Sequence, residues 1–278
     1  MFRYTRRTLV REIIFWLVAV VYLAPFYFLV TIALKDDSEV FSTSKLAPPM
    51  APTLDNFVRV LTATGNSNVI LGLINSILIT GGSIIMMVLL GSLTGYVILR
   101  STRRWSTAVY YLFLVAIVLP TQLGTVPLYI GARTIGLTGS VLGMIILYSG
   151  MLMPLAIFLY AGFFRSLGTE YEEAAAIDGA SRTQIFFRIV FPLMAPANGT
   201  VAILAGLIVW NDFFTSLIFL GGSTAQTLPV AMYYYIGSLV SAWNQIFAIV
   251  IISMIPILAF YLFAQKRFIQ GFAGGLKG

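Results

Sequence analysis

The residues best suited to a specific chemical task form a polar segment, 165–196, in a largely apolar chain of 278 residues. Four of the ten acidic residues of the chain fall between Glu170 and Asp178. Carboxylates gathered on one short segment attract positively charged groups of another molecule. The segment therefore predicts a surface on which a second protein docks, rather than a loop that only joins two helices.

Histidine and cysteine are both absent from the chain. Histidine is the usual general base near neutral pH, and these two residues supply most ligands of zinc, copper and haem. None of the four lysines follows a glycine, so a Walker A motif is missing as well. We therefore expect a protein that is not an enzyme, holds no metal and binds no cofactor of its own.

Two helix starts are predicted within the polar segment. Thr169 with Glu172, and Ser181 with Gln184, have the spacing of a capping box. Gly179 lies between them and tolerates the left-handed conformation in which many helices end. The sequence thus predicts two short helices hinged at 178–180.

Asp212 is the only acidic residue inside a predicted membrane span. An ionisable group at that depth costs about 3 kcal/mol unless it faces a cavity or a partner. One interpretation places Asp212 on a translocation path together with Asn75, Trp210 and Asn211. The other makes Asp212 a structural hydrogen-bond anchor or a helix cap beside a kink. We hypothesise the path.

Composition indicates the elements that must position these residues. The chain is 59% hydrophobic and 10% charged, against roughly 25% charged in soluble domains, so lipid is the solvent for most of it. It is predicted to be an all-α membrane protein with one domain, 1–278, a core at about 69–265 and a mostly irregular outer segment, 35–68, with a short helix at 54–61. Runs without charge predict six transmembrane helices, at about 13–34, 69–98, 106–130, 140–164, 197–220 and 243–265. The first run is too long for a cleaved export signal.

The distribution of lysine and arginine predicts the orientation. With the N-terminus inside, thirteen of the seventeen basic residues lie on the cytoplasmic side, as the positive-inside rule requires. Both termini and the segment 165–196 are then cytoplasmic. This asymmetry accounts for the net charge of +7 without any nucleic-acid partner.

The polar segment resembles the EAA motif of permease subunits of ATP-binding-cassette (ABC) importers. The likeness rests on Glu173-Ala174-Ala175, Asp178-Gly179-Ala180, Ile189 and Pro192. It implies the type I importer permease (MetI-like) fold and a coupling helix that seats in a cleft of a separate ATPase, with the glycine at the bend. The residues that this resemblance assigns to ATPase coupling are Glu170, Glu173, Ala174, Ala175, Asp178, Gly179, Ala180, Arg182, Ile189 and Pro192.

Three further motifs look like the sugar-importing branch of this family, and its maltose-type subunit in particular. They are Trp210-Asn211-Asp212-Phe213, Thr227-Leu228-Pro229-Val230 and the glycine-rich end 271–278. The resemblance implies a multi-pass subunit of the cell's inner or plasma membrane. Its partners would be a second permease, a dimer of ATP-binding subunits that hold ATP and magnesium, and an external sugar-binding protein.

Three alternatives stay open at this stage. The same machine would carry another solute, such as glycerol phosphate. An ion-coupled secondary transporter predicts more acidic residues within the spans and repeat symmetry. A membrane enzyme would need catalytic groups that the sequence lacks. The aromatic residues Tyr233-Tyr234-Tyr235, Trp243 and Phe247 are interpreted first as a membrane-interface belt, and second as a surface on which sugars stack.

Overall fold

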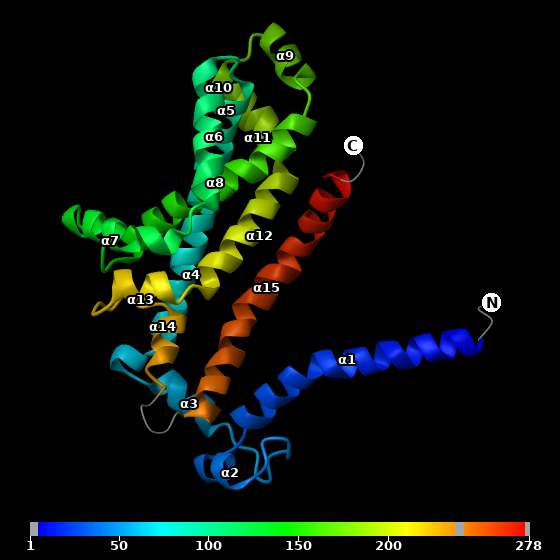
Figure 1. Ribbon diagram of the computed structural model, residues 1–278, viewed down its shortest axis with the longest axis vertical. Helices are drawn as coiled ribbons and strands as arrows, with labels where there is room; N and C mark the ends of the chain where they lie inside the picture. The colour runs from blue at the N-terminus through cyan, green and yellow to red at the C-terminus, as the bar shows by residue number, and fades with distance from the viewer. Residues whose placement is uncertain (1–4, 237–241, 276–278) are drawn as a thin grey trace. The chain divides into compact units, whose positions relative to one another are not determined.

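A computed structural model describes residues 5–236 and 242–275. Within these ranges the chain forms helices and turns and no strand, which confirms the all-α prediction. Figure 1 shows the chain as helices joined by turns, and its residues fall into two compact units. One contains Met1–Ile70 and Ala231–Ile255, and the other contains Leu71–Val230 and Pro256–Gly278.

The first unit is built on a long apolar helix, α1 (Arg6–Ala33). It is followed by α2 (Asp37–Ser42), α3 (Asp55–Thr62) and a 3-10 turn (Gly65–Ser67), and the unit also contains the start of α15 (Trp243–Gly275). The predicted helix at 54–61 is confirmed as α3, whereas α2 was missed. Its signal is Asp36, whose carboxylate accepts from the Glu39 backbone N–H at 2.6 Å as an N-cap.

The start of α15 is tied to this outer segment by one side chain. The Asn244 amide nitrogen donates to the Asp37 carboxylate at 2.7 Å and to the Asn56 side-chain oxygen at 3.0 Å. The Asn56 amide in turn donates to the backbone oxygens of Ala33 and Lys35, at 2.8 and 2.7 Å. These bonds hold the outer segment in a defined shape although half of its residues lie outside helices.

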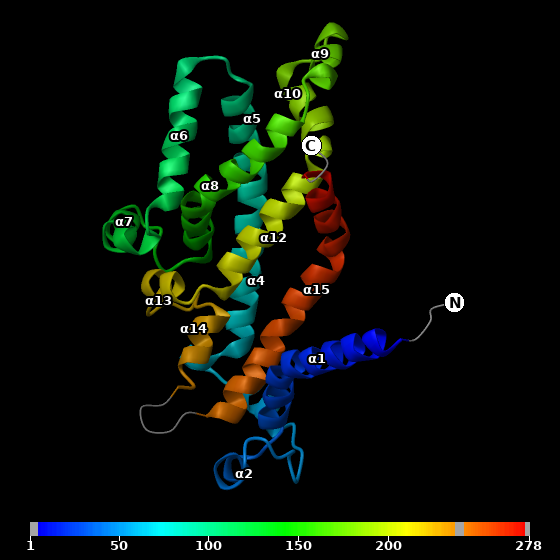
Figure 2. The ribbon, with the colours of Figure 1, turned by 45° about the vertical axis from the view of Figure 1, so that its right-hand side comes forward.

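The second unit carries most of the remaining helices (Figure 2). In order they are α4 (Val69–Met86), a π-helical turn (Met87–Gly91), α5 (Ser92–Arg100), α6 (Arg104–Val118), a 3-10 turn (Thr121–Gly124), α7 (Thr125–Thr134), α8 (Val141–Ser166), α9 (Glu170–Ile177), α10 (Arg182–Ile185), a second π-helical turn (Phe186–Val190), α11 (Phe191–Leu193), α12 (Ala195–Asn211), α13 (Phe214–Leu220) and α14 (Leu228–Tyr233). Two of these helices cross a unit boundary. The helix α4 begins in the first unit, just before the boundary after Ile70, and α14 ends in the first unit, just after the boundary that follows Val230.

Small residues let α5 and its preceding π turn approach α8 closely. A Cβ atom added at Gly91 would lie 3.2 Å from the Ala156 Cβ, and one added at Gly95 would lie 3.2 Å from the Tyr160 Cβ. Tyr160 is fully buried at this seam. The segment 91–95 is therefore a packing surface, as glycine spacing of this kind favours between membrane helices.

Four helices are long and apolar enough to cross a membrane, and the number is six if each of two bent pairs counts as one span. The predicted helix 106–130 is wrong as a continuous helix, because α6 ends at Val118 and the chain turns by 97° before α7. Pro120 has no N–H and disfavours a helical residue before it, which explains the break.

The predicted helix 197–220 is also interrupted. Asp212 leaves the helical conformation between α12 and α13, with φ −75° and ψ 119°. The other predicted spans hold, with longer ends: α1 starts at Arg6, α8 covers Val141–Ser166, and α15 continues to Gly275. The described helices thus fit four to six spans by length and composition.

Candidate functional site

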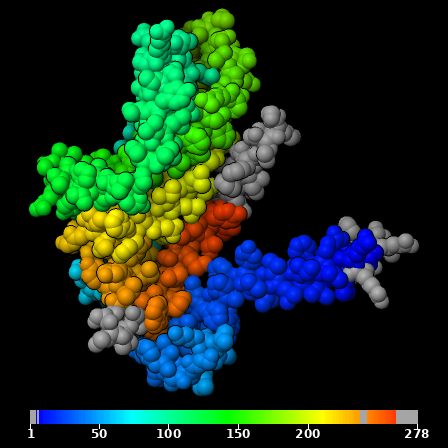
Figure 3. All heavy atoms as spheres, in the orientation of Figure 1, coloured from blue at the N-terminus to red at the C-terminus, as the bar shows by residue number. Residues whose placement is uncertain are grey.

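The predicted docking segment is an elbow of two short helices, α9 and α10, which we call the elbow (residues 170–185). It lies at the tip of the second unit, beyond the end of α8, and α9 projects there in the space-filling view (Figure 3). Gly179, between the helices, has φ +82°, the left-handed region that favours glycine. Its N–H donates to the Ala176 oxygen at 3.1 Å and closes the end of α9.

One of the two predicted capping boxes is present. The Ser181 hydroxyl accepts from the Gln184 N–H, and the Gln184 side chain accepts from the Ser181 N–H, at 3.3 and 2.8 Å. The box at Thr169 is wrong, because Thr169 takes a helical conformation and its side chain makes no cap bond. Its hydroxyl instead donates to the Glu173 carboxylate at 2.7 Å. A helical backbone at Thr169 points this hydroxyl away from the first free N–H groups.

The outer face of α9 is exposed and combines apolar and acidic side chains. Tyr171 and Ile177 are 60% and 86% exposed, although both are large and apolar. Ala174 is exposed between them, and Glu170 and Glu173 flank the stripe. Neighbouring exposed apolar side chains of this kind are a feature of protein-interaction surfaces.

The inner face of α9 is held to the rest of the unit. Ala175, which the sequence placed among the docking residues, is instead buried against the core that contains Tyr160, Phe164 and Phe186. The Glu172 carboxylate accepts from the Tyr96 hydroxyl at 2.9 Å and pairs with Arg100 at 2.8 Å. Sequence reasoning missed Tyr96, Arg100 and the inward direction of Glu172.

The remaining predicted coupling residues follow the elbow into the chain. Asp178 and Arg182 are exposed, and Ala180 is half-buried. Ile189 packs against the same core from within the second π turn, and Pro192 occupies the start of α11. The segment thus divides into an exposed face and an apolar side that anchors it.

A cavity of about 300 Å³, which we call the polar cavity, is bordered by the 3-10 turn before α7, the start of α7, α8 and the α12–α13 junction. Its polar lining residues are Thr121, Gln122, Thr125, Tyr148, Asp212 and Thr215. The Asp212 carboxylate accepts from the Tyr148 hydroxyl at 2.5 Å and from the Thr215 N–H at 3.1 Å. Asp212 therefore lines a cavity and also accepts a hydrogen bond from the first turn of α13, as the structural interpretation predicts. Its place on a translocation path stays a prediction.

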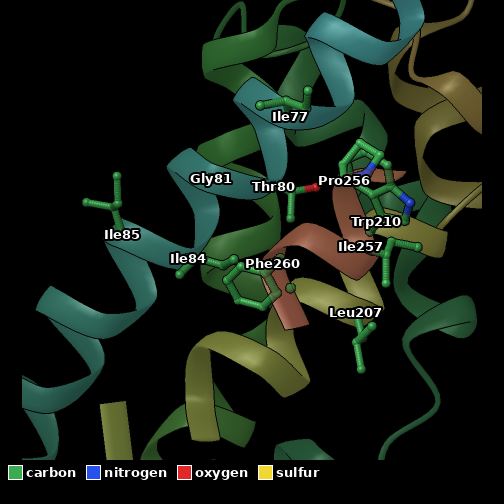
Figure 4. Close-up of a pocket in the computed structure, with 11 residues that line it drawn as sticks. Ile77, Thr80, Gly81, Ile84, Ile85, Leu207, Trp210, Pro256, Ile257 and Phe260 are labelled. Atoms are coloured by element: carbon green, nitrogen blue, oxygen red, sulfur yellow. The ribbon is translucent and has the colours of Figure 1, made fainter. Parts of the chain in front are cut away.

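A second cavity, of about 340 Å³, is lined almost wholly by apolar side chains of α4, α12 and α15 (Figure 4). Trp210 borders it, together with Ile84 and Phe260. The hydroxyl of Thr80 also belongs to this lining, is buried, and has no hydrogen-bond partner within the described residues. Trp210 and Asp212 thus face different cavities.

Asn75 and Asn211 line neither of these two cavities. The Asn75 amide donates to the Thr224 and Gln226 oxygens, at 3.1 and 2.9 Å, and fastens the loop before α14 to α4. The Asn211 amide donates back to the Leu207 oxygen at 2.8 Å within α12. The four residues predicted for the path therefore do not converge on one cavity. A single sequence does not place them relative to one another.

Within 5–236 and 242–275, no group of three or more histidine, cysteine, aspartate or glutamate residues is arranged to hold a metal ion. The only charged group at the polar cavity lining is Asp212, and no lysine or arginine lines it. The arrangement suits hydrogen bonding to neutral hydroxyl groups more than neutralisation of an anion.

Comparison with known proteins bears directly on this geometry. Residues 87–274 match the family described as binding-protein-dependent transport system inner membrane components. The chain is 34% identical to the melibiose/raffinose/stachyose import permease MelC of Bacillus subtilis, over 94% of both chains. It is 31% identical to a probable permease for starch degradation products, AmyC, of Thermoanaerobacterium thermosulfurigenes, over 92% of both.

A solved structure has the same fold. It is that of a bacterial ABC transporter involved in the import of the acidic polysaccharide alginate, with a TM-score of 0.82 and 20% identity over 96% of this chain and 100% of the other. The matched residues begin at the first π turn. They include the elements that border the polar cavity, as well as the elbow. The resemblance inferred from the EAA-like segment is thereby confirmed, and the chain belongs to the inner membrane components of binding-protein-dependent transport systems.

Proposed function

We propose that this protein is the permease subunit of an ATP-driven importer for di- or oligosaccharides, and that it forms half of the translocation path. The relatives MelC and AmyC are named as permeases for sugars and for starch degradation products. The hydroxyl and amide groups that border the polar cavity at Asp212, beside its apolar residues, support a neutral, hydroxyl-rich substrate. Its lack of basic side chains argues against glycerol phosphate, the leading alternative solute.

The observation that carries the proposal is the exposed face of α9. An apolar stripe with an acidic border suits a cleft that has apolar walls and a basic rim. We assign this cleft to a separate ATPase subunit, which binds ATP and magnesium. When two such subunits close around ATP, they would pull on the elbow and shift the helices between inward- and outward-facing states.

The surface of α1 supports a position in the membrane beside lipid or a second permease. Its most apolar stretch has a mean hydropathy of 2.5, and none of that stretch is buried by the rest of the chain. An external binding protein would deliver the sugar to the outer side. In this arrangement both termini and the elbow are cytoplasmic, which agrees with the distribution of basic residues.

The proposal is tested by reconstituting the chain in liposomes with its partner permease, ATPase subunits and binding protein. We expect melibiose, raffinose or a maltose-type oligosaccharide to stimulate ATP hydrolysis and to accumulate inside. Glu173→Lys reverses a charge on the exposed face of α9. Gly179→Pro cannot adopt φ +82° and lacks the N–H that bonds Ala176. Both should abolish coupled transport, while Arg103→Ala, at an exposed arginine elsewhere on this unit, serves as the matched control.

Each contrary outcome has a distinct meaning. Normal ATP-dependent uptake in both elbow variants would refute the assignment of the elbow to ATPase coupling. Stimulation of ATP hydrolysis by glycerol 3-phosphate but by no sugar would show that the importer carries glycerol phosphate instead of a sugar. Uptake driven by an ion gradient without ATP would favour a secondary transporter.

A further inference from the structure

A nearly buried ion pair joins α5 to α9, and we call Tyr96, Arg100 and Glu172 the clamp. The Glu172 Oε1 atom accepts from Arg100 Nε at 2.9 Å and lies 2.8 Å from an Arg100 terminal nitrogen, while Oε2 accepts from the Tyr96 hydroxyl at 2.9 Å. The Arg100 and Glu172 side chains are 20% and 13% exposed. In the other ion pair of the described residues, Arg59–Asp37, both side chains are more than half exposed.

Arg100 also binds the end of α8. The same guanidinium donates to the backbone oxygens of Leu167 and Gly168, at 2.9 and 3.2 Å. These oxygens lie at the C-terminal end of α8, where a positive charge complements the helix dipole. One side chain thus connects α5, the end of α8 and the first turn of α9.

Aromatic rings shield this connection from water. The Arg100 guanidinium lies 5.8 Å from the centre of the Phe164 ring. The Tyr96 ring lies 5.2 Å from that of Phe186 and 6.0 Å from that of Phe164. Lower exposure to water strengthens the attraction between the charges, so this pair resists separation more than a surface pair does.

We infer that the clamp is the positioning device that makes α9 move as one body with α5 and α8. The inference rests on the proposed function, in which a partner pulls on α9. Apart from the clamp, α9 is held by the short connections at 167–169 and 178–181 and by Ala175, the one residue of α9 that is buried in the core. Without the clamp, α9 would follow the ATPase while α5 and α8 lag behind, so ATP would be hydrolysed without transport. Arg100, Tyr96 and Glu172 touch no substrate in this role.

The first test measures position and needs no substrate. Because the chain has no cysteine, two spin labels on the full-length protein in liposomes, at Thr102→Cys after α5 and Ala174→Cys on α9, report one distance. Both positions are exposed. We expect a narrow distance distribution in the parent protein and a broad one with Glu172→Ala. An unchanged distribution with Glu172→Ala would overturn the clamp.

The second test measures coupling in the reconstituted importer, with the sugar that the parent protein accumulates. For Glu172→Ala and Arg100→Ala, we expect uptake per ATP hydrolysed to fall about tenfold, the factor equal to about 1.4 kcal/mol, with the ATPase subunits still bound. The double variant should be no worse than either single one, as expected for residues in one network. Tyr96→Phe should have a smaller effect, and Arg103→Ala none.

Two results would contradict the inference. Uptake and ATP hydrolysis that fall in equal proportion would mean that the residues only stabilise the protein. Fully additive effects would mean that Arg100 and Glu172 act separately. If instead Glu173→Lys and Gly179→Pro leave transport intact, the proposed function at the elbow fails, while the label distance still tests the clamp itself.

Discussion

At the scale of single residues, the carboxylate of Asp212 offers two separable properties, its charge and its oxygen acceptors. The Tyr148 hydroxyl and the Thr215 N–H both use the same oxygen, Oδ2. Asp212→Asn keeps one oxygen acceptor for these two bonds, removes the charge and turns the other oxygen into an amide donor. We predict that this variant stays folded while sugar uptake falls about tenfold, which corresponds to about 1.4 kcal/mol, because the cavity loses its one charged lining residue.

The control for this variant is Asp212→Ala, which also removes the cap of α13. Loss of such a cap costs about 1 kcal/mol. The midpoint of thermal unfolding should therefore drop with Asp212→Ala and change less with Asp212→Asn. If Asp212→Asn transports at the parent rate, Asp212 is a structural cap alone.

Asp37, in the outer segment, links stability to pH. Hydrogen bonds from Asn244 and Arg59 lower the pKa of this carboxyl below its ordinary value of 3.8. The charged form is thus favoured in the folded state, so its stabilising effect is present above pH 3.8 and is lost as the pH falls toward the lower, folded-state pKa. Thermal unfolding followed between about pH 5 and pH 3 should show this loss, and Asp37→Asn should flatten it.

Residue-level prediction succeeded where the cause was local. The left-handed glycine at 179 and the capping box at Ser181 depend on three or four neighbouring residues. The clamp could not be predicted, because Arg100 and Glu172 are 72 positions apart and nothing in one sequence pairs them. The direction of Ala175 was missed for the same reason, since its burial depends on packing against α8 and the second π turn.

At the scale of helices, the seam between α5 and α8 depends on glycine. Gly91→Leu would force atoms into the space held by Ala156 and Tyr160. Overpacking of this kind costs about 1–3 kcal/mol, and we predict a lower midpoint of thermal unfolding in detergent. Gly162→Leu, on α8 but with nothing within 4 Å of an added Cβ, is the matched control and should leave the midpoint nearly unchanged. Equal effects of both substitutions would show that the seam is not tightly packed.

Helix-level prediction found the apolar runs but not their interruptions. The length of a run without charge shows whether a helix can span the membrane. It does not show whether the helix bends or breaks within the run. The turn of 97° after α6 and the break at Asp212 place polar groups inside otherwise apolar runs. Pro120 and Asp212 are visible in the sequence, yet proline within α8 and α15 is accommodated in continuous helices. Packing decides between these outcomes.

At the scale of the whole molecule, the orientation in the membrane is the property that a cysteine-free chain makes easiest to measure. We predict that Thr102→Cys and Thr183→Cys react with a membrane-impermeant maleimide only after the cells are opened. Ala51→Cys and Thr134→Cys should react in spheroplasts with the outer face exposed. All four side chains are exposed to the surroundings in the structure. The reverse labelling pattern would invert the topology and move the elbow away from any cytoplasmic ATPase.

The exposure of α1 affects how readily the protein is degraded in the cell. Its most apolar stretch is not buried at all by the rest of the chain, whereas 39% of the corresponding stretch of α8 is buried. Packing within its own chain therefore contributes little to holding α1 in place, and without the partners proposed above this helix would stay loosely held. If the partners proposed above cover α1, the abundance of this protein in the cell should follow that of those partners rather than its own rate of synthesis, because poorly held chains are degraded more readily.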